Sequence, residues 1–289
     1  MRGGVDASPV QKIGLAGHVF SGAVVHNQGG RAWISNCKDG WLRLQAAPPA
    51  LAGAARCVTW KKAAGWRCAA GTGPNWRFRR QCREAGHEVL CVEADVADME
   101  ALERFADTAV SHFGRLDVWY NNAGMGIYKP LMDVSLEEWD GLMGINLRGV
   151  FAGSRLAAER MQQGGVIVNA SSFAARMPVA GNGAYAVSKW GVEALTRVLA
   201  AELVARGIRV FAYMPGMIET ELTRGRIEGH RETMTSSIPL NRLGTPEDLA
   251  PVLVMLTSDL AGYVTGCTVE ISGGKFCVQN PHFAWAAEN

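Results

Sequence analysis

From residue 84 onward, the sequence alternates between short apolar runs and longer segments whose apolar residues recur at helical spacing. The runs that we expect to be strands are 87–96, 115–124, 164–172, 207–216 and 266–274, and the expected helices are 98–114, 135–161, 181–206 and 245–258. Parallel neighbouring strands need long crossover connections, which are usually helices. This order therefore predicts an α/β fold with a doubly wound parallel sheet, in a single domain that takes in residues 1–289.

Three helix ends carry sequence signals. Ser135, followed three residues later by Glu138, matches a capping box at the start of the second expected helix. Gly114 suits the C-cap of the first helix because glycine accepts the left-handed conformation. Thr245, followed by proline at the first helical position, marks the start of the fourth helix. These signals support the helical assignment.

Residues 20–83 do not follow the alternation. They contain five of the nine tryptophans and four of the seven cysteines, and they contain no glutamate. We find no internal repeat and no strand–glycine loop–helix unit in this segment. Two explanations stay open. The segment is either divergent or inserted, or it is translated out of frame, because a GC-rich gene in a wrong frame yields many Trp, Cys, Arg and Gly residues and few acids.

The charge is divided unevenly along the chain. Residues 1–83 hold 13 Lys or Arg and two acidic residues, whereas residues 84–289 hold 16 Lys or Arg and 25 acidic residues. A basic segment can bind nucleic acid or a membrane surface. Here the basic residues are scattered and form no patch interleaved with aromatic residues, so we expect no nucleic-acid partner and no membrane partner.

The cysteines and histidines indicate no metal site. The seven cysteines form no CxxC pair, and the six histidines are dispersed. An odd, irregular set of cysteines is typical of reduced thiols in the cytosol. The first ten residues lack the apolar core of a signal peptide, and no apolar run approaches the roughly 18 residues of a membrane span. We therefore expect a protein of the cytoplasm without a bound metal.

The segment "GAYAVSKWG" (183–191) places Tyr185 and Lys189 four residues apart in an expected helix. Residues at i and i+4 lie one above the other on a helix face, so this phenol and this ammonium point the same way. An isolated pair of this kind is usually a surface pair without chemistry. Other polar clusters, however, fall at the expected carboxyl ends of strands, where ligands of α/β sheets bind. They comprise Asp95, Asn121 to Gly124, Ser171, Ser172, Pro215 and Gly216.

Ordered motifs between Arg83 and Gly274 resemble those of the short-chain dehydrogenase/reductases of the compact, single-domain type. The motifs are "DVAD", "NNAG", "IN", "VNASS", "YAVSK", "MPGMIETEL" and "SGG". The resemblance implies a Rossmann-like fold, NAD or NADP as the cofactor, and hydride transfer between that cofactor and a carbonyl or secondary alcohol. It assigns a catalytic tetrad, which comprises Asn146, Ser172, Tyr185 and Lys189.

The resemblance also assigns residues to the cofactor. Asp95 would lie near the adenine, Asn122 by the ribose side, and residues 215–220 around the nicotinamide. The full expected set is Asp95, Val96, Asn122, Ala123, Gly124, Tyr185, Lys189, Pro215, Gly216, Ile218 and Thr220.

Physical chemistry supports the roles in the tetrad. A tyrosine with an ordinary pKa of about 10 is a poor acid–base catalyst at neutral pH. Lys189, one turn away, would stabilise the phenolate and lower the pKa of Tyr185. In reduction, Tyr185 would donate a proton to the developing alkoxide while Ser172 holds the same oxygen. The amide of Asn146 would anchor a water that links the lysine to solvent, and the cofactor would supply the hydride.

The N-terminal part departs from the family pattern. A glycine-rich TGxxxGxG turn should follow "LAGH" (15–18), and it is missing. Such glycines let the backbone approach a pyrophosphate at a helix N-terminus. Neither "NQGGRAW" nor "AAGTGPNW" follows a credible strand or opens a helix, and the closing motif starts with Ser272 where the family commonly has an acid. The alternative is a non-catalytic member that binds no dinucleotide, and the choice between NAD and NADP is not encoded in the visible motifs.

The segment 217–240 follows the Pro-Gly strand end, and the resemblance implies a lid over the substrate. Phe173, Met177 and Met217 would line an apolar pocket for a small carbonyl or alcohol substrate, or they are core residues. No basic cluster indicates a phosphorylated substrate.

The helices 135–161 and 181–206 carry more apolar residues than one sheet face needs. These include Val150, Phe151, Trp190, Val192 and Leu195. The resemblance makes these the helices that pair across a two-fold axis, commonly in a homotetramer. The alternative is that all of these residues face the protomer's own sheet. The apolar C-terminal segment around Trp285 is expected to pack on a neighbouring subunit.

Overall fold

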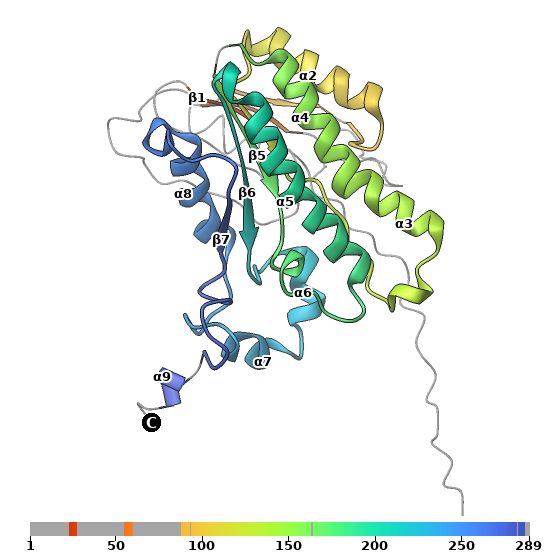
Figure 1. The fold of residues 1–289 in the computed structure, drawn as a ribbon, viewed down its shortest axis with the longest axis vertical. Helices are drawn as coiled ribbons and strands as arrows, with labels where there is room; N and C mark the ends of the chain where they lie inside the picture. The colour runs from red at the N-terminus through yellow and green to blue at the C-terminus, as the bar shows by residue number, and fades with distance from the viewer. Residues whose placement is uncertain are drawn as a thin grey trace, which may run out of the picture.

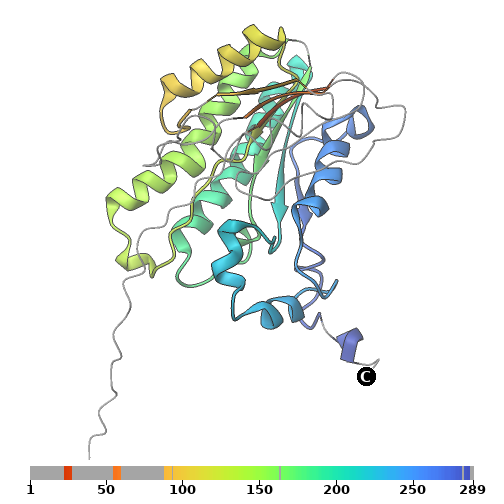
Figure 2. The same ribbon diagram turned by 180° about the vertical axis from the view of Figure 1, so that it is seen from behind.

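The structure, a computed structural model, describes residues 23–27, 55–59, 88–92, 94–162, 164–281 and 283–286. Within them, seven strands form one sheet in the order β3-β2-β1-β4-β5-β6-β7 (Figures 1 and 2). The strands are β1 (Ala23–Asn27), β2 (Ala55–Thr59), β3 (Glu88–Cys91), β4 (Val118–Asn121), β5 (Gly165–Ala170), β6 (Ile208–Pro215) and β7 (Thr268–Ile271). All five strands expected after residue 84 are present, and the doubly wound α/β fold is confirmed.

The direction of β1 sets it apart in the sheet. β2 pairs in parallel with β3, and β4 to β7 follow one another in parallel. β1 pairs antiparallel with both β2 and β4, so six strands share one direction and β1 opposes them. Ala23 lies beside Tyr120 and Val25 beside Val118, so β1 ends at the edge opposite to the carboxyl end of β4.

β1 and β2 belong to the atypical segment 20–83. The interpretation that no strand precedes the glycines of "NQGGRAW" is wrong, because β1 ends at Asn27, the first residue of that stretch. The glycines themselves lie outside the described residues, as do "LAGH" and "AAGTGPNW". The two explanations of the segment therefore concern residues that are mostly outside the described part.

Helices cover both faces of the sheet. The α-helices are α2 (Met99–Phe113), α3 (Leu136–Met143), α4 (Gly149–Arg160), α5 (Gly183–Leu203), α6 (Glu221–Ile227), α7 (Arg231–Ser236), α8 (Pro246–Thr257) and α9 (Phe283–Ala286). Single 3₁₀ turns lie at Leu131–Asp133, Phe173–Ala175, Val204–Arg206 and Asp259–Ala261. α2, α4 and α5 pack on one face and α8 on the other (Figures 1 and 2). No helix in the described part of the chain is long and apolar enough to span a membrane.

The expected helix ends are confirmed. Ser135 and Glu138 form both hydrogen bonds of a capping box at the start of α3. Gly114 follows α2 with a φ of 80°, the left-handed conformation that favours glycine. Thr245 caps α8, which has proline at its first position. One feature differs from the single helix expected over 135–161: Gly144–Arg148 form a π-helical turn between α3 and α4.

The central strands place alternate side chains in two apolar cores. Trp119 and Ile167 point towards α2, α4 and α5, whereas Tyr120 and Val168 pack with α8. Each of the four is at most 4% exposed. A sheet covered on both faces buries both sets of side chains, so its central strands are mostly apolar on both faces.

A buried polar network ties β4 and β5 to the helices. Nδ2 of Asn121 donates to Oγ of Ser154 (2.9 Å) and to Oδ1 of Asn169 (2.8 Å). Oδ1 of Asn121 accepts from Nε1 of Trp119 (2.7 Å), and Nδ2 of Asn169 donates to Oγ1 of Thr196 (2.9 Å). Buried polar groups are stable when they are hydrogen-bonded in this way. The network therefore fixes the carboxyl ends of β4 and β5 against α4 and α5.

Candidate active site

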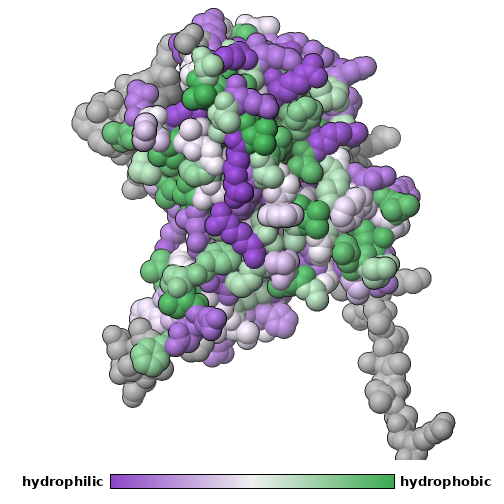
Figure 3. Space-filling view, in the orientation of Figure 1, coloured by the Kyte–Doolittle hydropathy of each residue, from purple (hydrophilic) through white to green (hydrophobic). Residues whose placement is uncertain are grey.

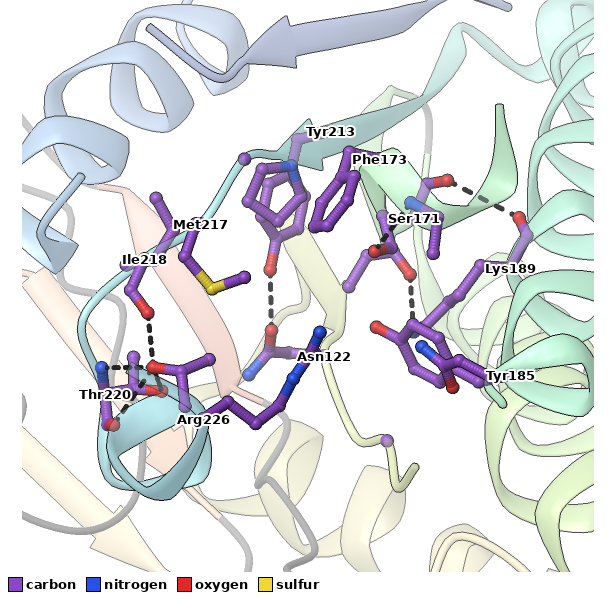
Figure 4. A pocket seen from close by; sticks show the side chains of 18 of the residues that line it. Asn122, Ser171, Phe173, Tyr185, Lys189, Tyr213, Met217, Ile218, Thr220 and Arg226 are labelled. Carbon is purple, nitrogen blue, oxygen red and sulfur yellow. Dashed lines mark hydrogen bonds between the residues drawn. The ribbon is translucent and has the colours of Figure 1, made fainter. Parts of the chain in front are cut away.

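A cleft opens where β4, β5 and β6 end at the same edge of the sheet, with a cavity of about 150 Å³. Loops after these strands, α5 and α6 supply its walls. Tyr185 and Lys189 on α5 lie on one side of the cleft, and Met217, Ile218 and Thr220 lie on the opposite side (Figure 4). This is the edge at which α/β sheets bind ligands.

Tyr185 and Lys189 stand one turn apart on α5, and both line the cleft. Tyr185 is half-buried, whereas Lys189 is 3% exposed. Nζ of Lys189 lies 5.7 Å from the ring centroid of Tyr185 and donates a hydrogen bond of 2.8 Å to the carbonyl oxygen of Ala170. The helical pairing expected from the sequence is therefore present.

Burial changes the proton affinities of this pair in opposite directions. It raises the pKa of Tyr185 to about 12 and lowers the pKa of Lys189 to about 8, because an apolar site disfavours both charged forms. A hydrogen bond with Ser172 lowers the pKa of Tyr185, the nearby Tyr128 raises it, and the charge of Arg226 lowers it. The net shift is upward, opposite to the lowering by Lys189 that the sequence suggested, because desolvation outweighs the favourable contacts.

Ser172 lies in the loop after β5 and is 5% exposed. Its Oγ accepts from the N–H of Ala174 (3.2 Å), which starts a single 3₁₀ turn. The adjacent Ser171 donates to Oε1 of Glu193 (3.1 Å), a side chain of α5 that is 2% exposed, and Arg176 donates to the other carboxylate oxygen (3.4 Å). These contacts hold the Ser172 loop against the helix that carries Tyr185.

Asn146 lies in the π-helical turn and is fully buried. Its Oδ1 accepts from the N–H of Met125 (2.8 Å), and its Nδ2 donates to the carbonyl of Met125 (2.9 Å) and to Oγ of Ser188 (3.0 Å). The side chain fastens the loop after β4 to α5, which explains an asparagine inside a helix. Both amide hydrogens are used in these contacts, whereas Oδ1 has a second lone pair that a water could use. The expected anchoring of a water by this amide stays a prediction.

Comparisons with known proteins identify the family of the chain. The family described as enoyl-(acyl carrier protein) reductase matches residues 56–275. The 3β-hydroxysteroid dehydrogenase 1 of Eggerthella lenta is 40% identical over 200 residues, which cover 68% of this chain and 77% of that protein. The chain belongs to the short-chain dehydrogenase/reductase family. The 3-oxoacyl-[acyl-carrier-protein] reductase FabG of Thermotoga maritima is 41% identical over 182 residues, with 62% of this chain and 74% of that protein covered.

A solved structure also shares the fold. A putative short-chain alcohol dehydrogenase from Sinorhizobium meliloti aligns with a TM-score of 0.67 at 33% identity and covers 70% of this chain and 82% of that chain. Members of the family are oxidoreductases that use NAD or NADP. This short-chain dehydrogenase/reductase therefore belongs to the enzymes that transfer hydride between a nicotinamide cofactor and a carbonyl or alcohol.

Most of the cofactor-binding residues expected in this short-chain dehydrogenase/reductase line the cleft. They are Asn122, Gly124, Tyr185, Lys189, Pro215, Gly216, Ile218 and Thr220. Asp95, Val96 and Ala123 do not. Oδ1 of Asp95 accepts from the N–H of Ala97 (3.0 Å), Val96 packs against Gly149, and Ala123 is 5% exposed in the core. Contact of these three with a cofactor stays a prediction.

Four further residues line the cleft and were missed by sequence reasoning. The hydroxyl of Tyr213 on β6 donates to Oδ1 of Asn122 (2.7 Å). Asn182 is 5% exposed, and its Oδ1 has no hydrogen-bond partner in the described part of the chain. Tyr128 and Arg226 face each other, with the guanidinium 5.0 Å from the ring centroid. Only Asn182 carried a signal, because asparagine just before a helix is a common N-cap.

The expected lid, residues 217–240, forms α6 and α7 beside the cleft. Phe173 and Met217 line the cleft, whereas Met177 is 39% exposed and does not. Nε1 of Trp285 donates to the carbonyl of Pro239 (2.9 Å). The C-terminal segment thus contacts the expected lid of its own chain, and its packing on a neighbouring subunit stays a prediction.

Proposed function

We propose that this short-chain dehydrogenase/reductase interconverts a small carbonyl compound and its secondary alcohol at Tyr185. The observation that carries the proposal is the convergence, in one cleft, of the Tyr185 hydroxyl, its partner Ser172 and the buried Lys189. In reduction, Tyr185 donates its proton to the carbonyl oxygen, and Ser172 donates a hydrogen bond to the same oxygen. The nicotinamide cofactor supplies the hydride when bound.

The pKa of Tyr185 suits proton donation. At about 12, it keeps the phenol protonated at neutral pH, so the group is ready for reduction. Oxidation of an alcohol needs the phenolate as base, and its rate should rise through the alkaline range. Initial rates in both directions, measured against pH, test this asymmetry.

The residues of the cleft fit the nicotinamide end of NAD or NADP. The ammonium of Lys189 has three donors, and Ala170 is its one acceptor among the described residues. The hydroxyl groups of a ribose would accept from the other two. A Cβ added at Gly124 would lie 3.5 Å from Nζ of Lys189, so glycine keeps space beside the ammonium. We assign Asn122, Gly124, Lys189 and residues 215–220 to this half of the cofactor, and Asn146 to positioning α5.

The test is oxidation of NADH or NADPH over a panel of ketones, β-ketoacyl thioesters and sugars. The wild-type protein should turn over at least one member, and Tyr185→Phe and Ser172→Ala should lose that turnover. Rates that are indistinguishable between the wild type and Tyr185→Phe on every substrate would contradict the proposal.

A second proposal, a chain that keeps this fold but binds no dinucleotide, is favoured by the direction of β1. β1 ends with Asn27 at the edge of the sheet away from the cleft, whereas phosphate-binding turns lie at the cleft edge. Calorimetric titration with NADH and NADPH separates the two proposals. Saturable binding excludes the second, and its absence excludes the first.

We further propose that the protein forms a homodimer or homotetramer through α4 and α5, in the cytoplasm. Phe151 and Trp190 are 48% and 66% exposed on these helices, whereas Val150 and Val192 are buried within the protomer and Leu195 packs on its core. Apolar and polar residues are mixed on this face, so the aromatic side chains would anchor the contact (Figure 3). Light scattering at micromolar concentration should show more than a monomer.

A further inference from the structure

Arg226 brings a second positive charge into the cleft. It lies on α6, is half-buried, and has no carboxylate partner among the residues that the structure describes. Two neighbouring arginines differ in this respect: Arg231 forms a two-point ion pair with Glu219, and Arg242 forms one with Asp248.

The geometry holds Arg226 in place. Its guanidinium lies 5.0 Å from the ring centroid of Tyr128, a distance at which a cation is attracted to an aromatic face. The side chain extends from α6 across the cleft towards Asn122 (Figure 4). Its charge also acts on Tyr185, which places it near the group that meets the reacting oxygen.

The composition of the wall favours an anionic ligand. The described residues that line the cleft include two cations, Lys189 and Arg226, and no Asp or Glu. Phe173, Met217 and Ile218 supply apolar surface around them, and a charge pair is stronger in such surroundings than in water. A guanidinium presents a planar fork of donors that matches a carboxylate or phosphate.

We propose that Arg226 binds an anionic group, a carboxylate or a phosphate, of the substrate whose carbonyl oxygen lies at Tyr185. The inference rests on the proposed function for the place of that oxygen. The dinucleotide cofactor is the other source of phosphate oxygens near this wall, so the experiment has separate substrate and cofactor arms.

The substrate arm compares charged and neutral ketones of the same shape. The probes are 3-oxobutanoate, 4-oxopentanoate and 5-oxohexanoate with their methyl esters, and dihydroxyacetone phosphate with dihydroxyacetone. In Arg226→Gln, kcat/KM for the preferred anionic substrate should fall about 10- to 100-fold, because a hydrogen bond to a charged group is lost. The value for its neutral counterpart should change less than about 3-fold, and Arg226→Lys should recover part of the loss.

Arg224→Gln is the matched control, because Arg224 is an exposed arginine of the same helix that does not line the cleft. Arg224→Gln should leave kcat/KM unchanged for both anionic and neutral substrates. Equal losses on anionic and neutral substrates in Arg226→Gln, or no loss on either, would overturn the inference while leaving the proposed function standing.

The cofactor arm measures binding without turnover. Calorimetric titrations with NADH, NADPH and pentanoate are compared for the wild type, Arg226→Gln and Arg224→Gln. Weaker binding of pentanoate with unchanged dinucleotide affinity supports the inference, even if no ketone is turned over and the proposed function fails. A loss confined to dinucleotide affinity means that Arg226 holds the cofactor, and the inference is then wrong.

Discussion

The two parts of the sheet differ in how their strands reach the cleft. β4, β5 and β6 end at one edge and are followed by Asn122, Ser172 and Gly216. β1 runs against them, so Asn27 lies at the far edge. In α/β sheets, ligands are bound by the loops at the carboxyl ends of strands. Strand direction therefore decides which part of the sheet supplies contacts.

The difference separates two properties of this chain. The proposed reacting groups are held by contacts among the loop after β4, β5, the π-helical turn and α5. Examples are the contacts of Asn146 with Met125 and Ser188 and that of Lys189 with Ala170. None of these contacts involves β1 or β2. Proton transfer at Tyr185 and affinity for a dinucleotide should therefore respond to different substitutions.

The largest effect is expected for Tyr185→Phe. Removal of the hydroxyl takes away the proton donor, so kcat/KM should fall about 10²- to 10⁴-fold. The Kd for NADH or NADPH, measured by calorimetry, should change little, because the ring that faces the cleft is kept. Tyr263→Phe is the control, since Tyr263 is fully exposed. If Tyr185→Phe lost turnover and dinucleotide affinity together, proton transfer and cofactor binding would not be separate properties of the chain.

A proline in β1 tests the other part of the sheet. Val25 pairs with Cys57 of β2 and Val118 of β4, so it lies inside the sheet rather than at its edge. Val25→Pro removes an N–H from the ladder and leaves its acceptor unpaired, so it should lower the free energy of unfolding by about 1–3 kcal/mol. Urea unfolding followed by circular dichroism measures the change.

Val25→Thr serves as the matched variant, because it keeps the N–H and a β-branched side chain. It should lower the free energy of unfolding clearly less than the proline does. If the two variants were equally stable, β1 would not be a central strand, and the contrast between the two parts of the sheet would be lost.

Much of the fold after residue 84 could be predicted, because its signals are local. Capping at Ser135 and the left-handed Gly114 are set by neighbouring residues, and apolar periodicity predicted the five strands and the long helices. The short helices α6, α7 and α9 were not predicted. The pair Tyr185 and Lys189 was predictable for the same reason, since helical geometry alone brings positions i and i+4 together.

Features that depend on pairing between distant segments could not be read from the sequence. The direction of β1 is set by its two neighbours in the sheet, and no local pattern encodes it. Arg226 lies among polar residues of the lid and has no motif around it. The upward shift in the pKa of Tyr185 follows from burial by surrounding elements, whereas the sequence displayed only the nearby lysine. Sequence patterns therefore predicted which side chains meet in the cleft better than they predicted the pKa values of these side chains.

A smaller effect is expected in the pH dependence of stability. Burial lowers the pKa of Lys189 from 10.5 to about 8, so the unfolded chain binds more protons than the folded chain between these values. The cost of the buried ammonium is fully present below about pH 8 and disappears as the pH rises towards 10.5. Between pH 7 and 10, the wild type should therefore gain about 2 kcal/mol relative to Lys189→Met.

Urea unfolding at fixed pH steps measures this difference. Burial raises the pKa of Tyr185 from 10.0 to about 12, so ionisation of this tyrosine lowers the stability of the folded chain above about pH 10. The series of pH steps therefore ends at pH 10. Repeating it in a Tyr185→Phe background removes that contribution. A pH-independent difference between the two proteins would mean that the ammonium is solvated, and that the cleft part of the sheet is less enclosed than the geometry indicates.

The smallest effect is expected where the C-terminal segment contacts the expected lid, residues 217–240. Trp285→Phe removes the hydrogen bond to Pro239 from a side chain that is 43% exposed, so the loss should be about 0.5–1 kcal/mol. Such a local loss should speed amide exchange in residues 231–240 about 2- to 5-fold, as measured by mass spectrometry, with the global unfolding midpoint nearly unchanged. Phe283→Leu, at a 72% exposed neighbour, is the control and should leave amide exchange unchanged.

Light scattering on the same samples decides between this own-chain contact of Trp285 and the packing on a neighbouring subunit that the sequence suggested. Faster exchange at constant mass supports the own-chain contact, whereas a smaller assembly with unchanged lid exchange would show that Trp285 serves the interface instead.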